Sequence, residues 1–162
     1  MAGAWIPSAM VSSQARKLGV EMVGETPQTS ASAQALWRKS WGYHGVNPMP
    51  CRILAVKQHG EVVGASYYET DRGFLSSIAV DPDHRNKGLG RLLIAATVED
   101  MAAKGVREPH LHVMGSDMAK SNGKLKTLYE SCGFIDQGGG SFQMDAVPAD
   151  LDAWMTRILQ SA

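Results

Sequence analysis

The sequence predicts an α/β (α+β) domain in which helices flank a mixed, mainly antiparallel sheet. Three observations support this fold class. Consecutive β-rich runs in the middle of the chain are separated by short turns, which is typical of an antiparallel meander. An apolar helix then leads to a further short strand, which can return beside the last meander strand through a right-handed crossover. Amphipathic segments in both halves of the chain supply the covering helices.

Length and composition favour one domain with one core. The chain has 162 residues, of which 44% are hydrophobic, and we expect residues 19–162 to form a single domain. Residues 1–18 are expected to be an N-terminal extension with a short helix capped by Ser8. The 16 basic and 16 acidic residues balance, so no overall field favours nucleic acid or an anionic membrane. We therefore expect a small ligand and neither of those partners.

The cysteines and the N-terminal segment bear on the compartment. Cys51 and Cys132 match no metal-ligand spacing and lie in apolar segments, so we expect two small buried hydrophobes, a reducing compartment and no metal site. Residues 1–20 lack the continuous apolar stretch of a secretory signal, but they contain Ser, Arg and Lys without acids. The sequence indicates a cytoplasmic protein, with an organellar transit peptide over residues 1–20 as the alternative.

The first half of the chain is predicted to contain two helices and four strands. Gly19 should end the helix that Ser8 begins, and Thr29 or Ser30 should cap the second helix. A hairpin turn is expected at His59-Gly60-Glu61. The four strands are expected at 20–23, 51–58, 62–70 and 74–80.

The second half is predicted to alternate covering helices with short strands. An apolar helix begins near Gly90 and ends at Gly105, and a second helix carries Tyr129 and ends at Gly133. Gly138-Gly139-Gly140 should be a flexible turn between the last two strands. The remaining strands and the C-terminal helix are expected at 109–114, 134–136, 141–146 and 151–159.

A basic, glycine-rich turn, Arg85-Asn86-Lys87-Gly88-Leu89-Gly90, joins the last meander strand to the apolar helix. Glycines let a ligand approach the backbone closely, and the helix presents the positive end of its dipole. The pattern predicts a phosphate or pyrophosphate site, and the alternative is a solvated turn before a helix. A P-loop and a dinucleotide-binding fingerprint need glycine spacings that do not occur here.

The order of these features resembles the GNAT superfamily of acetyl-CoA-dependent N-acetyltransferases. Residues 78–90 are similar to the strand, turn and pyrophosphate loop of that family, and Tyr129-Glu130-Ser131-Cys132-Gly133-Phe134 is similar to its second signature. The resemblance implies direct transfer of acetyl from acetyl-CoA to a primary amine in a ternary complex. It leaves the acceptor open between a small amine, a protein α-amine and a lysine, and it leaves open whether the chain forms a homodimer.

The resemblance also implies roles for single residues. Loop N–H groups would bind the coenzyme pyrophosphate, and the edge of the preceding strand would bind the pantetheine arm as an added strand. Tyr129 matches the general acid that protonates the departing thiolate, with core packing as the alternative. The residues implied to bind the coenzyme are Ile78, Ala79, Val80, Arg85, Asn86, Lys87, Gly88, Leu89, Gly90, Arg91 and Asn122, the last with a cap or loop role as its alternative.

The sequence offers several candidates for the general base and does not decide among them. Some relatives place a Glu near the start of the strand before the loop, where this chain has Phe74. His112 lies in a Leu-His-Val segment similar to that of some protein N-terminal acetyltransferases of the fold, and Glu69 and His44 are further candidates, as is a water chain. The competing functions are a non-catalytic acyl-CoA-binding or partner-binding module and a domain that binds another phosphate ligand, such as ATP or NAD.

Overall fold

The computed structural model describes residues 5–41, 51–70, 72–113 and 123–160. Within them a seven-stranded sheet has the order β1-β2-β3-β4-β5-β7-β6. Only the β4–β5 pair is parallel among the strand pairs of these residues. The mixed, mainly antiparallel sheet is therefore confirmed. The strands are β1 (Glu21–Val23), β2 (Cys51–Gln58), β3 (Glu61–Glu69), β4 (Phe74–Val80), β5 (His110–His112), β6 (Ile135–Gly138) and β7 (Ser141–Gln143).

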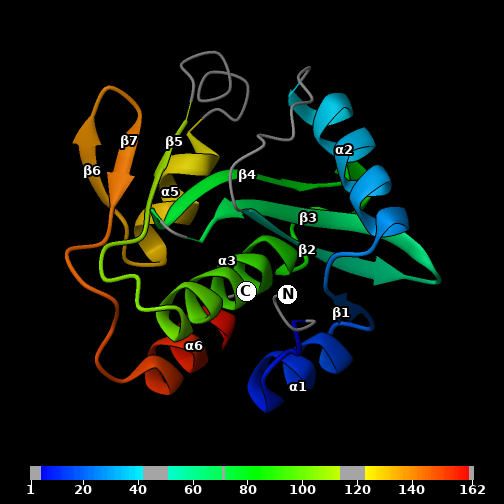
Figure 1. Ribbon diagram of the computed structural model, residues 1–162, viewed down its shortest axis with the longest axis horizontal. Helices are drawn as coiled ribbons and strands as arrows, with labels where there is room; N and C mark the ends of the chain where they lie inside the picture. Colours follow the sequence, from blue (N-terminus) through cyan, green and yellow to red (C-terminus); the bar gives the residue numbers. More distant parts are fainter. Residues whose placement is uncertain (1–4, 42–50, 71, 114–122, 161–162) are drawn as a thin grey trace.

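Helices cover both faces of the sheet (Figure 1). α2 packs on one face, whereas α1, α3 and α6 pack on the other, where α3 contacts β2, β3 and β4. A 3-10 turn, η1, lies between β4 and α3. The bounds are α1 (Ala9–Lys17), α2 (Pro27–Trp41), η1 (Pro82–His84), α3 (Leu89–Ala103), α5 (Lys124–Ser131) and α6 (Leu151–Gln160).

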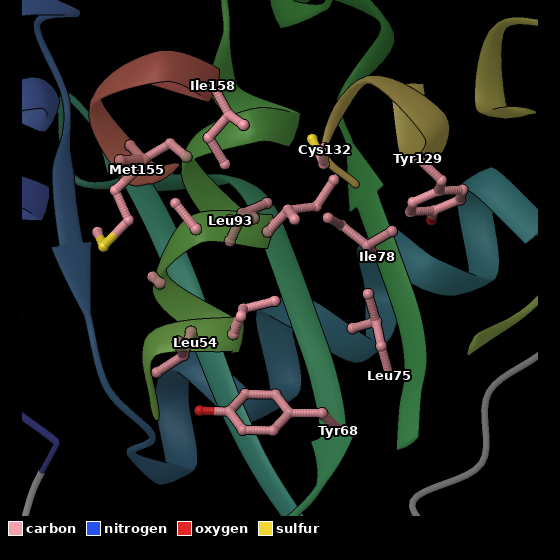
Figure 2. Close-up of a cluster of buried hydrophobic side chains, with 14 of the residues drawn as sticks. Leu54, Tyr68, Leu75, Ile78, Leu93, Tyr129, Cys132, Met155 and Ile158 are labelled. Atoms are coloured by element: carbon pink, nitrogen blue, oxygen red, sulfur yellow. The ribbon is translucent and has the colours of Figure 1, made fainter. Parts of the chain in front are cut away.

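The main core lies between the sheet and α3 (Figure 2). Side chains alternate across a strand, so Tyr68 of β3 enters this core while its neighbour Tyr67 packs on the α2 face. α3 lies between the sheet and α6, and its buried side chains consequently surround most of the helix. The predicted apolar helix is confirmed, and Gly105 ends it with a positive φ of 85°.

The start of α2 differs from the prediction. Thr29 and Ser30 do not cap this helix, because it begins at Pro27 and the preceding Thr26 makes the cap hydrogen bonds. The Thr26 hydroxyl accepts a hydrogen bond from the Thr29 N–H at 3.1 Å, and the Thr29 hydroxyl accepts one from the Thr26 N–H at 2.7 Å. Proline suits the first helical position, since its missing N–H would have no partner inside the helix.

Several strand boundaries also differ from the prediction by one or more residues, and two of these differences have clear local reasons. His59 and Gly60 both have positive φ and form a two-residue hairpin turn, so Glu61 belongs to β3 rather than to the turn. β7 ends at Gln143 instead of Ala146. There the Met144 N–H donates to the Pro109 carbonyl at 2.9 Å, but proline has no N–H to continue the ladder.

The N-terminal helix contributes to the main core. Ser8 caps α1 as predicted, with its hydroxyl accepting from the Val11 N–H at 3.3 Å. Val11 and Ala15 are buried in the main core beside α3 and α6. The division of the chain at residue 18 stays a prediction. No helix in the described residues is long and apolar enough to cross a bilayer.

Candidate functional site

The site is built around a fork between β4 and β5. The two parallel strands share the pairs Phe74–His110 and Leu75–Leu111. Beyond these pairs β4 follows β3 to Val80, whereas β5 follows β7. The strands diverge in Figure 1. A parting of two parallel strands is a place where an extended ligand can pair with a strand edge.

A β-bulge marks the start of the divergence. Tyr68 pairs with Leu75 and Tyr67 pairs with Ser77, so Ser76 is the extra residue on β4. A bulge bends its strand and increases the local twist. The bulge therefore explains why β4 leaves β5 one residue after their last shared pair.

The glycine-rich turn lies at the far end of β4 and leads into α3. Gly88 is the N-cap of α3 with a φ of 85°, and no side chain caps the helix. The first intrahelical bond runs from the Leu92 N–H to the Gly88 carbonyl at 3.1 Å. The N–H groups of the first helical residues consequently point out of the helix end, where an anion can accept them.

Two arginines of this segment have different surroundings. Arg85 is exposed and donates from Nε to the Val80 carbonyl at 3.0 Å, which folds its side chain back onto the end of β4. Arg91 is half-buried, and its guanidinium approaches the Cys132 sulfur at 3.8 Å. Because burial dominates the surroundings of the Cys132 thiol, its pKa is raised, and Cys132 is a neutral core residue.

Tyr129 projects from α5 toward β4 near Ile78 (Figure 2). It is 4% exposed and belongs to the same core cluster as Ile78. Its ring contacts those of Phe134 and Phe142, with centroid distances of 5.9 and 5.8 Å. Phe142 pairs across the sheet with Leu111, the last β5 residue beside β4. The packing thus places Tyr129 against the core side of the fork.

His112 is the first β5 residue beyond the β4 pairing. It is exposed, and it lies on the sheet face opposite to its buried neighbour Leu111. Its Nδ1 lies 3.3 Å from the Ser141 hydroxyl of β7, the residue that it pairs with in register. The fork therefore has a phenol on one side and an imidazole on the other.

Glu69 is enclosed by its neighbours. It is 3% exposed at the end of β3, and its carboxylate accepts from Arg72 Nε at 2.7 Å. The Arg72 guanidinium also lies over the Phe74 ring, 5.9 Å from the centroid. This carboxylate is buried and engaged, whereas the His112 imidazole is exposed. Asn122 and His44 lie outside the described residues.

Comparison with known proteins identifies the family. Residues 50–136, more than half of the chain, match the acetyltransferase (GNAT) domain family. The chain belongs to the GNAT family.

Individual relatives of this GNAT domain agree with that assignment. The chain is 39% identical to the [ribosomal protein bS18]-alanine N-acetyltransferase of Escherichia coli K12 over 64 residues, which are 40% of each chain. It is 27% identical to the L-amino acid N-acyltransferase MnaT of the same organism over 110 residues, which are 64% of this chain and 59% of MnaT. The matched region thus spans less than two thirds of either relative.

Solved structures share the fold of this GNAT domain. The ribosomal-protein-S18-alanine N-acetyltransferase from Escherichia coli superposes with a TM-score of 0.63 at 18% identity, covering 79% of this chain and 94% of the other. The PaiA N-acetyltransferase from Thermoplasma acidophilum, in complex with coenzyme A, gives a TM-score of 0.56 at 14% identity, with 77% and 98% covered. The predicted GNAT-type sheet is confirmed by these neighbours.

Two features of this GNAT domain were not found from the sequence. Ser141 beside His112 becomes visible only once the strand register is known. The second is a buried polar cluster in which Asp100 accepts from the Tyr68 hydroxyl at 2.6 Å and pairs with Arg52 and Lys104 at 3.4 and 3.6 Å. Among the described residues, no group of three or more His, Cys, Asp or Glu side chains is arranged to hold a metal ion.

Proposed function

We propose that this GNAT domain transfers acetyl from acetyl-CoA to a primary α-amine by direct attack in a ternary complex. The observation that carries the proposal is the fork. It has an open helix N-terminus after the end of β4, and candidate acid and base side chains lie on its two faces beside the strand.

The donor would lie along β4. The pyrophosphate would accept hydrogen bonds from backbone N–H groups of residues 85–91, and the pantetheine would follow the edge of Ile78–Val80. A charge-assisted hydrogen bond contributes about 1.5 to 3 kcal/mol, whereas micromolar affinity needs about 8 kcal/mol. The loop and the strand edge must therefore act together. Leu89 would contribute only its backbone, since its side chain is buried in the core.

The chemistry needs one proton removed and one supplied. The neutral amine nitrogen attacks the thioester carbonyl carbon, and His112 accepts a proton from that nitrogen as the C–N bond forms. The C–S bond then breaks, and the Tyr129 hydroxyl donates its proton to the departing sulfur. The products are an N-acetyl amide and coenzyme A, and solvent restores both side chains to their starting protonation states.

An α-amine is the acceptor class that the relatives favour. One acts on the alanine of a ribosomal protein and another on L-amino acids, as their names state. An α-amine with a pKa near 8 is about one-tenth neutral at pH 7, whereas about one lysine in 2,500 is neutral. A single exposed imidazole can therefore suffice for an α-amine. We place peptide N-termini first, because the ribosomal-protein enzyme is the more similar in the matched region.

A thiol-release assay with acetyl-CoA tests the proposal. The acceptors would be an alanine-initiated peptide, the same peptide with a blocked N-terminus, free L-alanine, an internal lysine peptide and spermidine. We expect release with the free N-terminus and none with the blocked peptide. Thermal stabilisation by acetyl-CoA without release from any amine would instead establish a binding module. Stabilisation by ATP or NAD alone would refute the donor.

A further inference from the structure

The Ser141 hydroxyl lies within hydrogen-bond distance of His112, the candidate base. His112 and Ser141 face each other on β5 and β7, with Nδ1 and Oγ 3.3 Å apart. A neutral imidazole carries one N–H, and the other ring nitrogen keeps a lone pair. A base that acts through Nε2 must carry its N–H on Nδ1.

The glycine turn before Ser141 also lies beside the ring. A Cβ added to Gly140 would lie 3.3 Å from His112 Cε1 and would collide with the Val113 carbonyl oxygen. Gly140 also has a positive φ of 86°, and its carbonyl accepts from the Val113 N–H at 2.7 Å. A turn forms where it was predicted, but it consists of Gly139 and Gly140 alone, because Gly138 belongs to β6 and pairs with Ser141. Its last glycine is packed closely against β5. The exposed ring thus has the Gly140 backbone near Cε1 and the Ser141 hydroxyl near Nδ1.

We propose that Ser141 is a positioning residue that accepts a hydrogen bond from His112 Nδ1–H and thereby keeps the Nε2 lone pair directed at the acceptor amine. This inference rests on the proposed function, because it assumes that His112 is the base. When Nε2 takes the amine proton, the same Nδ1–H···Oγ bond stabilises the imidazolium. Ser141 would then act on turnover without touching either substrate.

Other polar groups near this face are already engaged. Among the described residues, His110 lies on the same strand with its ring 5.3 Å from that of Phe74. Glu69 is paired with Arg72. Gln143 donates to the Glu108 carboxylate at 3.2 Å. Gln143 lies on the same strand and face as Ser141, which makes it a matched control.

Ring-nitrogen NMR of the His-labelled protein tests the assignment, with the His112 signals identified by their loss in His112→Asn. For the neutral ring, we expect the Nδ1–H form in the wild type. That preference should be lost in Ser141→Ala, kept in Ser141→Thr and unchanged in Gln143→Ala. An Nε2–H wild type, or a tautomer unaffected by Ser141→Ala, would overturn the proposal.

Kinetics separate this inference from the proposed function. Ser141→Ala should lower kcat about 5- to 10-fold, which corresponds to one lost neutral hydrogen bond, and Ser141→Thr should restore it. Full turnover in His112→Asn would refute the role of His112 as the base. If the His112 tautomer of the otherwise unchanged protein still depended on Ser141, the hydrogen bond between the two residues would stand.

Discussion

Replacing Tyr129 with Phe separates the two roles that this residue combines. The substitution removes only the hydroxyl and keeps the ring against Phe134 and Phe142. If Tyr129 only fills the core, turnover should be nearly unchanged. If it protonates the departing thiolate, turnover should fall while the fold survives.

The expected size follows from the chemistry and the packing. General acid catalysis contributes about 10²- to 10⁴-fold, and we expect the lower end, about 10²-fold in kcat, because a thiolate with a pKa near 8.5 leaves readily. A lost buried hydroxyl costs about 1 to 2 kcal/mol of unfolding free energy, or a few degrees in Tm. Tyr129→Ala would instead remove a ring that is 4% exposed and cost about 3 to 5 kcal/mol.

The assay measures single-turnover thiol release at saturating acetyl-CoA beside a thermal melt of each variant. Tyr129→Phe should bind acetyl-CoA as tightly as the wild type, melt within a few degrees of it and release thiol about 10²-fold more slowly. Turnover above half of the wild-type rate would refute the acid role and leave core packing as the account of this residue.

Three further predictions concern the loop and stability. Gly88→Ala should weaken acetyl-CoA binding. Gly105 has the same φ of 85° at the other end of α3, so Gly105→Ala is a control that should introduce similar backbone strain of about 1 kcal/mol. Gly105→Ala should leave the Kd for acetyl-CoA unchanged. Equal Kd values for the two variants by calorimetry would refute the loop as the pyrophosphate site. Asp100 is 7% exposed and is the shared acceptor of the polar cluster with Tyr68. Asp100→Ala should lower the free energy of unfolding, measured with urea, by about 3 to 5 kcal/mol. A decrease below about 1 kcal/mol would contradict this prediction. The Asp83 N–H is the main reason that the pKa of Asp81 lies below 3.8. Ionised Asp81 therefore stabilises the fold above that pH, and this contribution is lost as the pH falls toward the pKa of the folded state. In Asp81→Asn, the free energy of unfolding should depend less steeply on pH in this acidic range.

The elements of the fold were largely predictable because their signals are local. Gly105 and Gly133 end helices as expected, since a left-handed residue after the last turn is a property of the backbone alone. The error at the start of α2 arose because Thr26, Thr29 and Ser30 are all good caps. The reciprocal bonds between Thr26 and Thr29 decide among them.

The candidate site was predictable in its residues and not in its geometry. Tyr129 and His112 were singled out from the sequence, and their roles stay predictions. That they lie on opposite faces of one fork follows from the pairing of Phe142 with Leu111 and from the alternation of side chains along β5. The enclosure of Glu69 by Arg72 likewise needed coordinates, because a sequence separation of three residues in a turn does not fix whether two charges meet.

By itself, the sequence determined the sheet class, the glycine-rich turn at a helix start near Gly90 and the family motif around it. These depend on glycine geometry and on hydrophobic periodicity, which act over a few residues. Only the tertiary structure decided where β4 parts from β5 and which groups meet there. The bulge at Ser76 and the register that sets Ser141 against His112 depend on pairing between strands far apart in the chain, and no local pattern encodes that pairing.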